Sequence, residues 1–271
     1  MWLALPACAV VGYLCLCAWF WVHQRDFQYA PGGAAGTPAA VGLVGFTAVE
    51  IETTDGERII GWWTPPGRTG DGVVLYLHGT PGTLPDCAPG RLRDLQSVGL
   101  GALAIDYRGY GGSTGSPSEA GIKLDALAAF DFIHSQAPRS KIAVFGESFG
   151  TGIAVALATE RPIAGVLLNA PFASVLRLYK LRAPPILPYR WLLRDQYNSE
   201  ALISQVAAPI MIMHGTADDN VPISEARRLY AAARQPKSMI EIKGAGHLSA
   251  WEMGGKPSAL EALAEWTAPS R

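Results

Sequence analysis

The chain has 271 residues, 49% of them hydrophobic, and a formal net charge of −1. This length allows one large domain or two small ones with an ample core, and the near-neutral charge gives no indication of a nucleic-acid partner. Of the four cysteines, three fall within the first 22 residues, so the sequence contains no disulfide framework. No spacing of Cys, His, Asp or Glu is typical of a metal site, and we expect neither a metal nor a cofactor.

The first 22 residues, MWLALPACAVVGYLCLCAWFWV, contain no charged side chain. A helix of this length can cross a hydrocarbon core of ~30 Å, and tryptophans lie near both of its ends, at Trp2, Trp19 and Trp21. A cleaved signal peptide is the alternative, but a basic n-region and a clear small-x-small cleavage site are missing. We therefore expect an uncleaved transmembrane anchor over residues 1–24. The charges that flank it assign no orientation in the membrane.

Residues 25–47 are rich in Gly, Ala and Pro, which is typical of a linker. Beyond them we expect a single domain, 48–271, because no repeat or second boundary is evident. Short apolar runs predict strands at 48–53, 58–63, 73–77, 102–106, 141–145, 164–168, 209–213 and 238–242. The TTDGE sequence at 53–57 predicts a hairpin turn between the first two strands.

Helical patterns follow the strands from the third strand onward, at 86–98, 119–136, 148–160, 222–234 and 256–267. Short apolar strands that alternate with helices predict an α/β fold with a mostly parallel, eight-stranded sheet covered on both faces. In such sheets, ligands bind at the carboxyl ends of the strands. The residues that directly follow the strands are therefore the candidates for chemistry.

The sequence KIAVFGESFGTG, at 141–152, ends a buried strand in a G-x-S-x-G pattern. In a sharp turn from strand to helix, the central residue is strained, and nearby backbone leaves room only for glycine two positions to either side. Gly146 and Gly150 meet that need, and the turn would lift the Ser148 hydroxyl out of the sheet. The bare pattern also arises by chance in a chain rich in glycine, but the strand before it and the helix after it favour a nucleophile.

A serine hydroxyl needs a base that takes its proton. Of the five histidines, His247 lies in a glycine-rich loop between the last strand and the last helix, which can carry an imidazole to the edge of the sheet. An acid must orient that imidazole, and the sequence IMIMHGTADDNVP offers Asp218 and Asp219 after a strand. We favour Asp218, with Asp219 as a solvated or helix-capping neighbour ahead of Pro222.

The resulting order along the chain, serine then acid then histidine, is that of α/β-hydrolases. Residues 48–271 resemble this superfamily along their whole length, through the motifs LHGTPG, DYRGYGGSTGSP, GESFG, HGTADDNVP and GAGH. The branch they resemble most contains membrane-anchored, short-lidded serine esterases, thioesterases and monoacylglycerol-lipase-like enzymes. The resemblance implies the α/β-hydrolase fold and a Ser148–Asp218–His247 triad, and it says little about the substrate.

The oxyanion formed by nucleophilic attack needs two N–H donors. We expect one from the backbone of Phe149, which follows the nucleophile. The other must come from the HGTPG loop, where Pro81 has no N–H, so Thr80 is the expected donor and Gly79 the alternative. The resemblance also points to Thr80.

Residues of about 170–205, between the sixth and seventh strands, correspond to the lid of these folds. Four aromatic side chains in or beside this segment are candidates to line an acyl groove, with core packing as the alternative: Phe172, Tyr179, Tyr189 and Trp191. Five basic residues and no acidic ones lie between 173 and 194: Arg177, Lys180, Arg182, Arg190 and Arg194. These charges predict a lid that docks on anionic lipid headgroups, unless acids elsewhere in the fold balance them.

The expected chemistry is acyl transfer to water through an acyl-serine. A carboxylic ester hydrolase acting on a small acyl ester is the favoured function. An acyl-protein or acyl-CoA thioesterase would use the same residues on a different leaving group. A non-catalytic domain tethered to the membrane is the third alternative.

Overall fold

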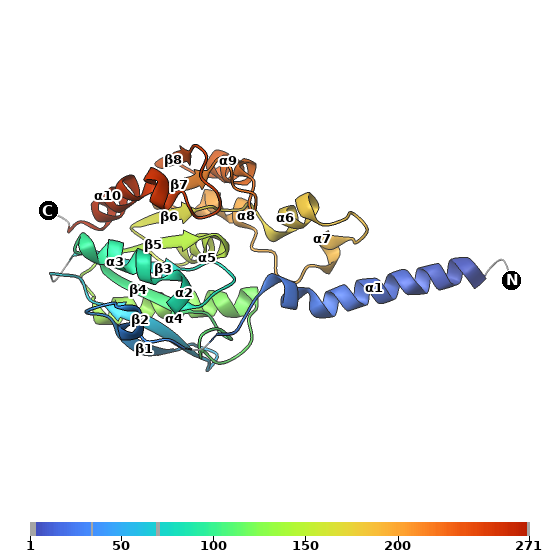
Figure 1. Cartoon of the computed structure of the whole chain (residues 1–271), viewed down its shortest axis with the longest axis horizontal. Coiled ribbons are helices and arrows are strands. Elements are labelled where there is room, and N and C mark those ends of the chain that lie inside the picture. The colour runs from blue at the N-terminus through green and yellow to red at the C-terminus, as the bar shows by residue number, and fades with distance from the viewer. Residues whose placement is uncertain (1–3, 34, 69–70, 270–271) are drawn as a thin grey trace.

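The computed structural model describes residues 4–33, 35–68 and 71–269, so Trp2 lies outside the described residues. Within them, eight strands form one sheet in the order β1-β2-β4-β3-β5-β6-β7-β8 (Figure 1). The strands are β1 Thr47–Glu52, β2 Arg58–Thr64, β3 Val73–Leu77, β4 Gly101–Asp106, β5 Ile142–Glu147, β6 Gly165–Asn169, β7 Ile210–Gly215 and β8 Lys237–Ile242. The pairs β1–β2 and β2–β4 are antiparallel and the others parallel. The predicted eight-stranded, mostly parallel sheet is confirmed.

The central strands are apolar throughout because both of their faces are buried. Every residue of β3 is buried, and alternate side chains enter two separate cores. Leu75 and Val144 belong to one core, and Tyr76 and Phe145 belong to the other. The continuous apolar runs of the sequence therefore come from strands that have no solvent-facing side.

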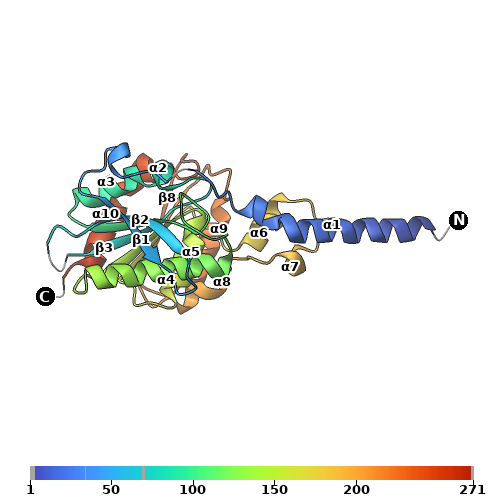
Figure 2. The ribbon, with the colours of Figure 1, turned by 90° about the horizontal axis from the view of Figure 1, so that it is seen from below.

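Helices cover both faces of this sheet. The α-helices of the described residues are α1 Ala4–Gln28, α2 Leu84–Cys87, α3 Pro89–Ser97, α4 Glu119–Gln136, α5 Phe149–Ala158, α6 Val175–Arg182, α7 Tyr189–Leu192, α8 Ser199–Leu202, α9 Ile223–Ala232 and α10 Lys256–Thr267. Residues of α3 and α10 share the core that holds Tyr76, whereas α4, α5 and α9 share the core that holds Leu75. Figure 2 shows α2 and α3 on one side of the strands and α4 on the other. The five predicted helical regions correspond to α2 with α3, and to α4, α5, α9 and α10.

The N-terminal helix projects from the domain (Figures 1 and 2). Its segment Ala7–Gln28 is long and apolar enough to cross a membrane. The helix continues past the expected anchor boundary at residue 24, because its last turns are bound to the domain. Part of the segment that we expected to be a linker is buried, at Tyr29, Leu43 and Phe46. The described residues directly before β1 are therefore packed against the domain.

Candidate active site

Ser148 lies at the turn between β5 and α5, with the unusual backbone angles φ 49° and ψ −114°. A Cβ atom at Gly146 would come within 2.6 Å of the Gly150 carbonyl oxygen. A Cβ atom at Gly150 would overlap the backbone of Leu77, at the end of β3. These contacts are the reason for glycine at both positions, as the sequence pattern predicts.

The structure brings Ser148, His247 and Asp218 together from three separate loops at the carboxyl ends of the strands. His247 Nε2 is 2.9 Å from the Ser148 Oγ, and His247 Nδ1 is 2.8 Å from Asp218 Oδ2. With its proton on Nδ1 donated to the carboxylate, the imidazole accepts the serine hydroxyl at Nε2. Asp219 is exposed to solvent, so Asp218 is the acid that lies against the imidazole.

Asp218 is held by more partners than the sequence suggested. Its Oδ1 accepts hydrogen bonds from the N–H groups of Asn220 and Val221, both at 2.8 Å. Its Oδ2 also lies 3.3 Å from Nε2 of His214, the histidine that precedes the β7 glycine. Burial alone would raise the pKa of Asp218, but hydrogen bonds from His214, His247 and the Val221 N–H outweigh burial and hold this pKa well below its usual range. The carboxylate therefore stays ionised throughout the neutral pH range.

Two backbone N–H groups lie beside the serine. Thr80 and Phe149 line the same cavity as Ser148. Within the described residues, neither the Thr80 N–H nor the Phe149 N–H donates a hydrogen bond to the protein. Phe149 is the first residue of α5, so its N–H belongs to the free amino end of a helix, which favours negative charge. Both groups are available to an oxyanion formed at Ser148.

A network of buried polar groups holds Glu147, the residue that precedes the turn. Glu147, which precedes the serine, accepts hydrogen bonds from the Tyr76 hydroxyl at 2.6 Å, from Asn169 Nδ2 at 2.8 Å and from Arg91 Nε at 2.9 Å. Three partners on three different elements fix the carboxylate of Glu147 and, with it, the end of β5. No motif in the sequence predicts this network, because its members are far apart in the chain.

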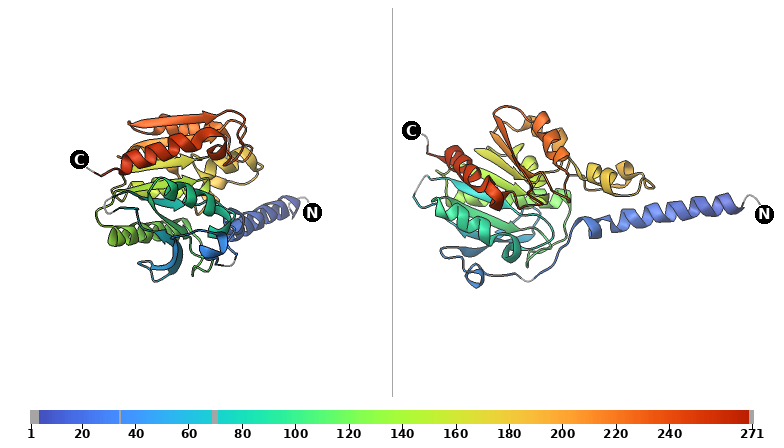
Figure 3. Two further views of the ribbon diagram at one scale, coloured as in Figure 1. Left: turned by 60° about the vertical axis from the view of Figure 1, so that its left-hand side comes forward. Right: turned by 45° about the horizontal axis from the view of Figure 1, so that its top comes forward.

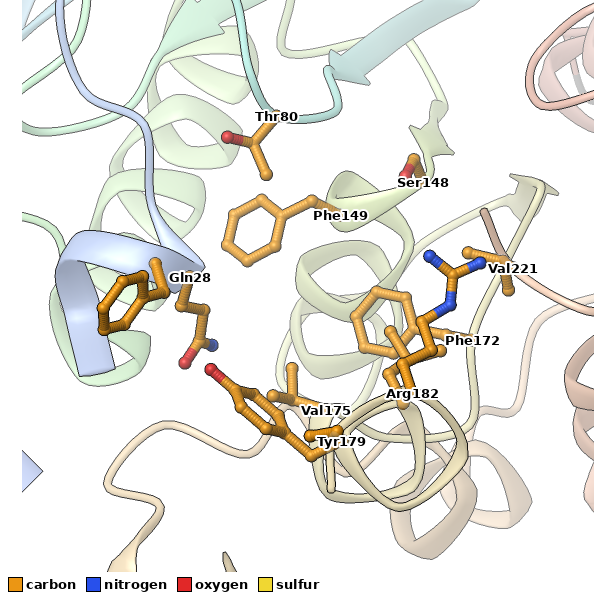
Figure 4. Close-up of a pocket in the computed structure, with 12 residues that line it drawn as sticks. Gln28, Thr80, Ser148, Phe149, Phe172, Val175, Tyr179, Arg182 and Val221 are labelled. Atoms are coloured by element: carbon orange, nitrogen blue, oxygen red, sulfur yellow. The ribbon is translucent and has the colours of Figure 1, made fainter. Parts of the chain in front are cut away.

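Two hollows meet at Ser148. One is a cavity of about 350 Å³, shown in Figure 4, whose lining is mostly apolar: Phe27, Gln28, Thr80, Ser148, Phe149, Phe172, Val175, Leu178, Tyr179, Arg182, Ala183 and Val221. The other is a larger cleft of about 830 Å³ that includes His247 and the charged residues Asp86, Arg91 and Glu147. The serine thus lies between an apolar cavity and a cleft that also contains charged side chains.

Proteins that are similar to this chain indicate its family. A family model described as the alpha/beta hydrolase fold matches residues 72–184. The uncharacterized protein Rv2307c of Mycobacterium tuberculosis is 38% identical over 249 residues, which are 90% of this chain and 88% of that protein. The chain belongs to the α/β-hydrolase superfamily.

Two characterised proteins are also similar. The lysophosphatidylserine lipase ABHD12 of Macaca fascicularis is 29% identical over 201 residues, which are 67% of this chain and 50% of that protein. The esterase Pf2001 of Pyrococcus furiosus has a solved structure with a TM-score of 0.73 and 22% identity, covering 88% of this chain and 97% of the esterase chain. At this identity, the likeness to the Pyrococcus esterase shows the fold alone. Together with the family match, these relatives place the chain among hydrolases of the esterase and lipase type.

The expected acyl-groove residues divide into two pairs in this hydrolase. Phe172 and Tyr179 line the cavity beside Ser148, whereas Tyr189 and Trp191 are absent from its described lining and border a separate hollow between α6 and α7. Tyr189 is buried against Phe20 of α1, with ring centroids 5.5 Å apart, and Trp191 is 80% exposed. The expectation for Tyr189 and Trp191 is therefore wrong, because Tyr189 packs against α1 and Trp191 faces solvent.

The end of α1 is bound to the lid through polar contacts. Gln24 donates to the Leu192 carbonyl at 2.9 Å and accepts from the Arg194 N–H at 2.7 Å. Arg25 makes two hydrogen bonds, of 2.6 and 3.0 Å, to the buried carboxylate of Asp195. These bonds bring Phe27 and Gln28 into the cavity wall, a role that no sequence signal near the site predicts. The lid lies beside the base of α1 in both views of Figure 3.

The basic residues of the lid differ in their partners. Arg177 is paired with the fully buried Glu225, at 2.7 Å, so its charge is balanced within the fold. Arg182 donates to the Asp219 carbonyl, and the Arg194 guanidinium stacks over Trp21. In the part of the chain that the structure describes, no carboxylate lies within ion-pair distance of the other four basic residues of the lid, namely Lys180, Arg182, Arg190 and Arg194.

Proposed function

We propose that this chain is a serine hydrolase that cleaves carboxylic acyl esters through an acyl-serine intermediate. The observation that carries the proposal is the unbroken chain of hydrogen bonds from Ser148 through His247 to Asp218, placed at the mouth of an apolar cavity. The esterase and lipase among its relatives support the same reaction class. The apolar cavity suits an acyl chain, and the cleft with its charged side chains suits an alcohol leaving group.

In this mechanism, the Ser148 Oγ attacks the ester carbonyl while His247 Nε2 takes the hydroxyl proton. The Thr80 and Phe149 N–H groups stabilise the resulting oxyanion, and Asp218 stabilises the imidazolium. The imidazolium then gives its proton to the departing alkoxide, and the alcohol leaves. Water, deprotonated by His247, attacks the acyl-serine, and Ser148 regains its proton as the carboxylic acid leaves.

The leaving group separates this function from a thioesterase that would use the same residues. The deciding experiment measures kcat/KM of the full-length protein with p-nitrophenyl esters of increasing chain length and with an acyl thioester of each length. Higher kcat/KM for the oxygen esters supports the proposal, and higher kcat/KM for the thioesters assigns a thioesterase instead. Failure of an active-site fluorophosphonate to label Ser148 would indicate a non-catalytic binding domain.

The pH dependence of kcat/KM should report the base. An imidazolium cannot accept the serine proton, so we expect kcat/KM to fall on acidification as the base takes up a single proton. Asp218 does not contribute to a decrease between pH 8 and pH 5, because its hydrogen bonds hold its pKa well below its usual range. Activity at saturating and at limiting substrate should be measured from pH 5 to pH 8. A flat profile would count against His247 as the base.

We also propose that α1 anchors the protein in a membrane and that the lid rests on the lipid headgroups. Five exposed residues of α6, α7 and the segment between them form what we term the lid patch: Lys180, Leu181, Ile186, Arg190 and Trp191. Because α1 leaves the domain beside this patch, a bilayer around α1 brings its headgroups to the lid (Figures 1 and 2). Apolar and basic side chains together are typical of a surface that binds anionic membranes.

This proposal predicts a dependence on anionic lipid. Each basic residue near an anionic surface contributes about 1 kcal/mol to membrane binding. Lys180→Gln with Arg190→Gln should therefore raise KM for a membrane-borne ester by as much as about thirtyfold at low salt. The measurement uses full-length protein in nanodiscs with and without anionic lipid, at low and high salt. The matched control is Arg139→Gln with Lys141→Gln. These two exposed charges lie just before β5, at the edge of the sheet opposite the active site. Equal KM values for both double variants under all conditions would contradict the proposal.

A further inference from the structure

The apolar cavity contains one side chain whose presence the hydrolytic mechanism does not explain. Gln28, from the last turn of α1, lines the cavity together with Phe149 and Phe172. Its Oε1 and Nε2 are both buried, and neither has a hydrogen-bond partner within the described residues. In Figure 4 its carboxamide points toward the Tyr179 hydroxyl, on the far side of the Phe149 ring from Ser148.

The position of Gln28 is fixed by its neighbours on both sides. Gln24 and Arg25 bind the segment after α7, and the Tyr29 hydroxyl lies 2.9 Å from that of Tyr197. The helix end that carries Gln28 is therefore held against the cavity wall. A buried amide without a partner is unfavourable, and a bound ligand that satisfies it gains about tenfold to a hundredfold in affinity.

We propose that Gln28 is a specificity-determining residue that recognises a hydroxyl group on the acyl chain of the substrate. This inference rests on the proposed function, in which the acyl chain occupies the cavity. A carboxamide both donates and accepts, and a hydroxyl group also does both, so one hydroxyl can satisfy Nε2 or Oε1. A carboxylate only accepts, so it could pair with Nε2 but never with Oε1. The remaining cavity surface around Val175 and Leu178 suits the methylene groups of the chain.

The inference predicts a preference that depends on chain length, because only one length brings the hydroxyl to Gln28. The experiment compares kcat/KM for pairs of p-nitrophenyl esters, plain and terminally hydroxylated, from butanoyl to decanoyl, with the full-length protein. At the matching length, Gln28→Leu should lower the ratio of kcat/KM for the hydroxylated ester to kcat/KM for the plain ester about tenfold to a hundredfold. Tyr179→Phe, which removes only a hydroxyl, should reduce the same preference by a smaller factor.

Gln205→Leu, the same change at an exposed glutamine, is the matched control and should leave every ratio unchanged. Fluorophosphonate labelling of Ser148 at the wild-type rate shows that the site is intact, and Gln28→Met provides a second apolar variant if Gln28→Leu fails to fold. An equal ratio of hydroxylated to plain ester in wild type and Gln28 variants, at every length, would overturn the inference.

Two further outcomes are distinguishable. A second comparison measures kcat/KM for a monoacylglycerol and for an ethyl ester that carry the same plain acyl chain. If Gln28→Leu selectively impairs the monoacylglycerol, the hydroxyl that Gln28 recognises belongs to the alcohol, and the assignment to the acyl chain is wrong. If wild-type protein hydrolyses none of the esters and resists labelling, the proposed function itself fails, whereas efficient cleavage of plain esters with unchanged ratios rejects only the role of Gln28.

Discussion

Replacing Ser148 with alanine should lower kcat by about 10⁴-fold to 10⁶-fold and abolish labelling by a fluorophosphonate. The variant loses only the hydroxyl oxygen that His247 activates, so no covalent intermediate can form. The free N–H groups of Thr80 and Phe149 remain, and they account for the small residual rate that such variants retain. Hydrolysis of a p-nitrophenyl ester under saturating conditions measures the decrease.

The fold should survive this change, because alanine keeps the Cβ that the strained turn already accommodates. The thermal midpoint of Ser148→Ala should therefore equal that of the wild-type protein within a few degrees. Ser135→Ala, at an exposed position on α4, is the matched control and should change neither activity nor labelling. Retention of a tenth of wild-type activity in Ser148→Ala would place the nucleophile elsewhere.

Much of the fold was predictable because its signals are local in sequence. Strands buried on both faces read as continuous apolar runs, and β3 is the clearest example. The glycine pattern around Ser148 reflects one contact between residues close along the chain, Gly146 with Gly150. It also reflects the approach of Gly150 to Leu77, at the end of the neighbouring strand β3. The motifs that contain Ser148, Asp218 and His247 each follow a strand, so the sheet topology alone brings them to one edge.

The walls of the cavity were not predictable in the same way. Gln24 and Arg194 are 170 residues apart, and nothing in either local sequence indicates their contact. Tyr179 and Tyr189 are the same type of residue in the same segment, yet Tyr179 lines the cavity and Tyr189 packs against α1. Which aromatic faces the substrate depends on where α1 docks, a tertiary property that hydrophobic pattern does not encode.

The partners of the basic residues of the lid were also not predictable from the sequence. Composition alone marks Arg177 and Lys180 as equivalent basic residues of one segment. In the fold, Arg177 is paired with Glu225 on α9, whereas Lys180 is exposed on the lid patch. Buried Glu225 needs a partner, since an unpaired carboxylate would be costly inside the domain. One of the five predicted docking charges therefore serves the stability of the lid instead.

The second large effect concerns the acid. Asp218→Asn should lower kcat by about 10⁴-fold, whereas Asp219→Asn should lower it less than about tenfold. The Asp218 carboxylate accepts from His247 through one oxygen and from the Asn220 and Val221 N–H groups through the other. An amide offers only one acceptor oxygen, so its NH₂ group must face a donor on one side.

The backbone N–H groups cannot change their role, and together they favour the amide oxygen on their side. The NH₂ group of the Asp218→Asn side chain then faces His247 and selects the tautomer with the proton on Nε2, which cannot accept the Ser148 proton. The Asp219 side chain is exposed and makes no contact with the imidazole, so its amide variant keeps the working tautomer. Steady-state kcat of the two variants, compared at one pH above 7, decides between them, and the reverse ranking would transfer the role of the acid to Asp219.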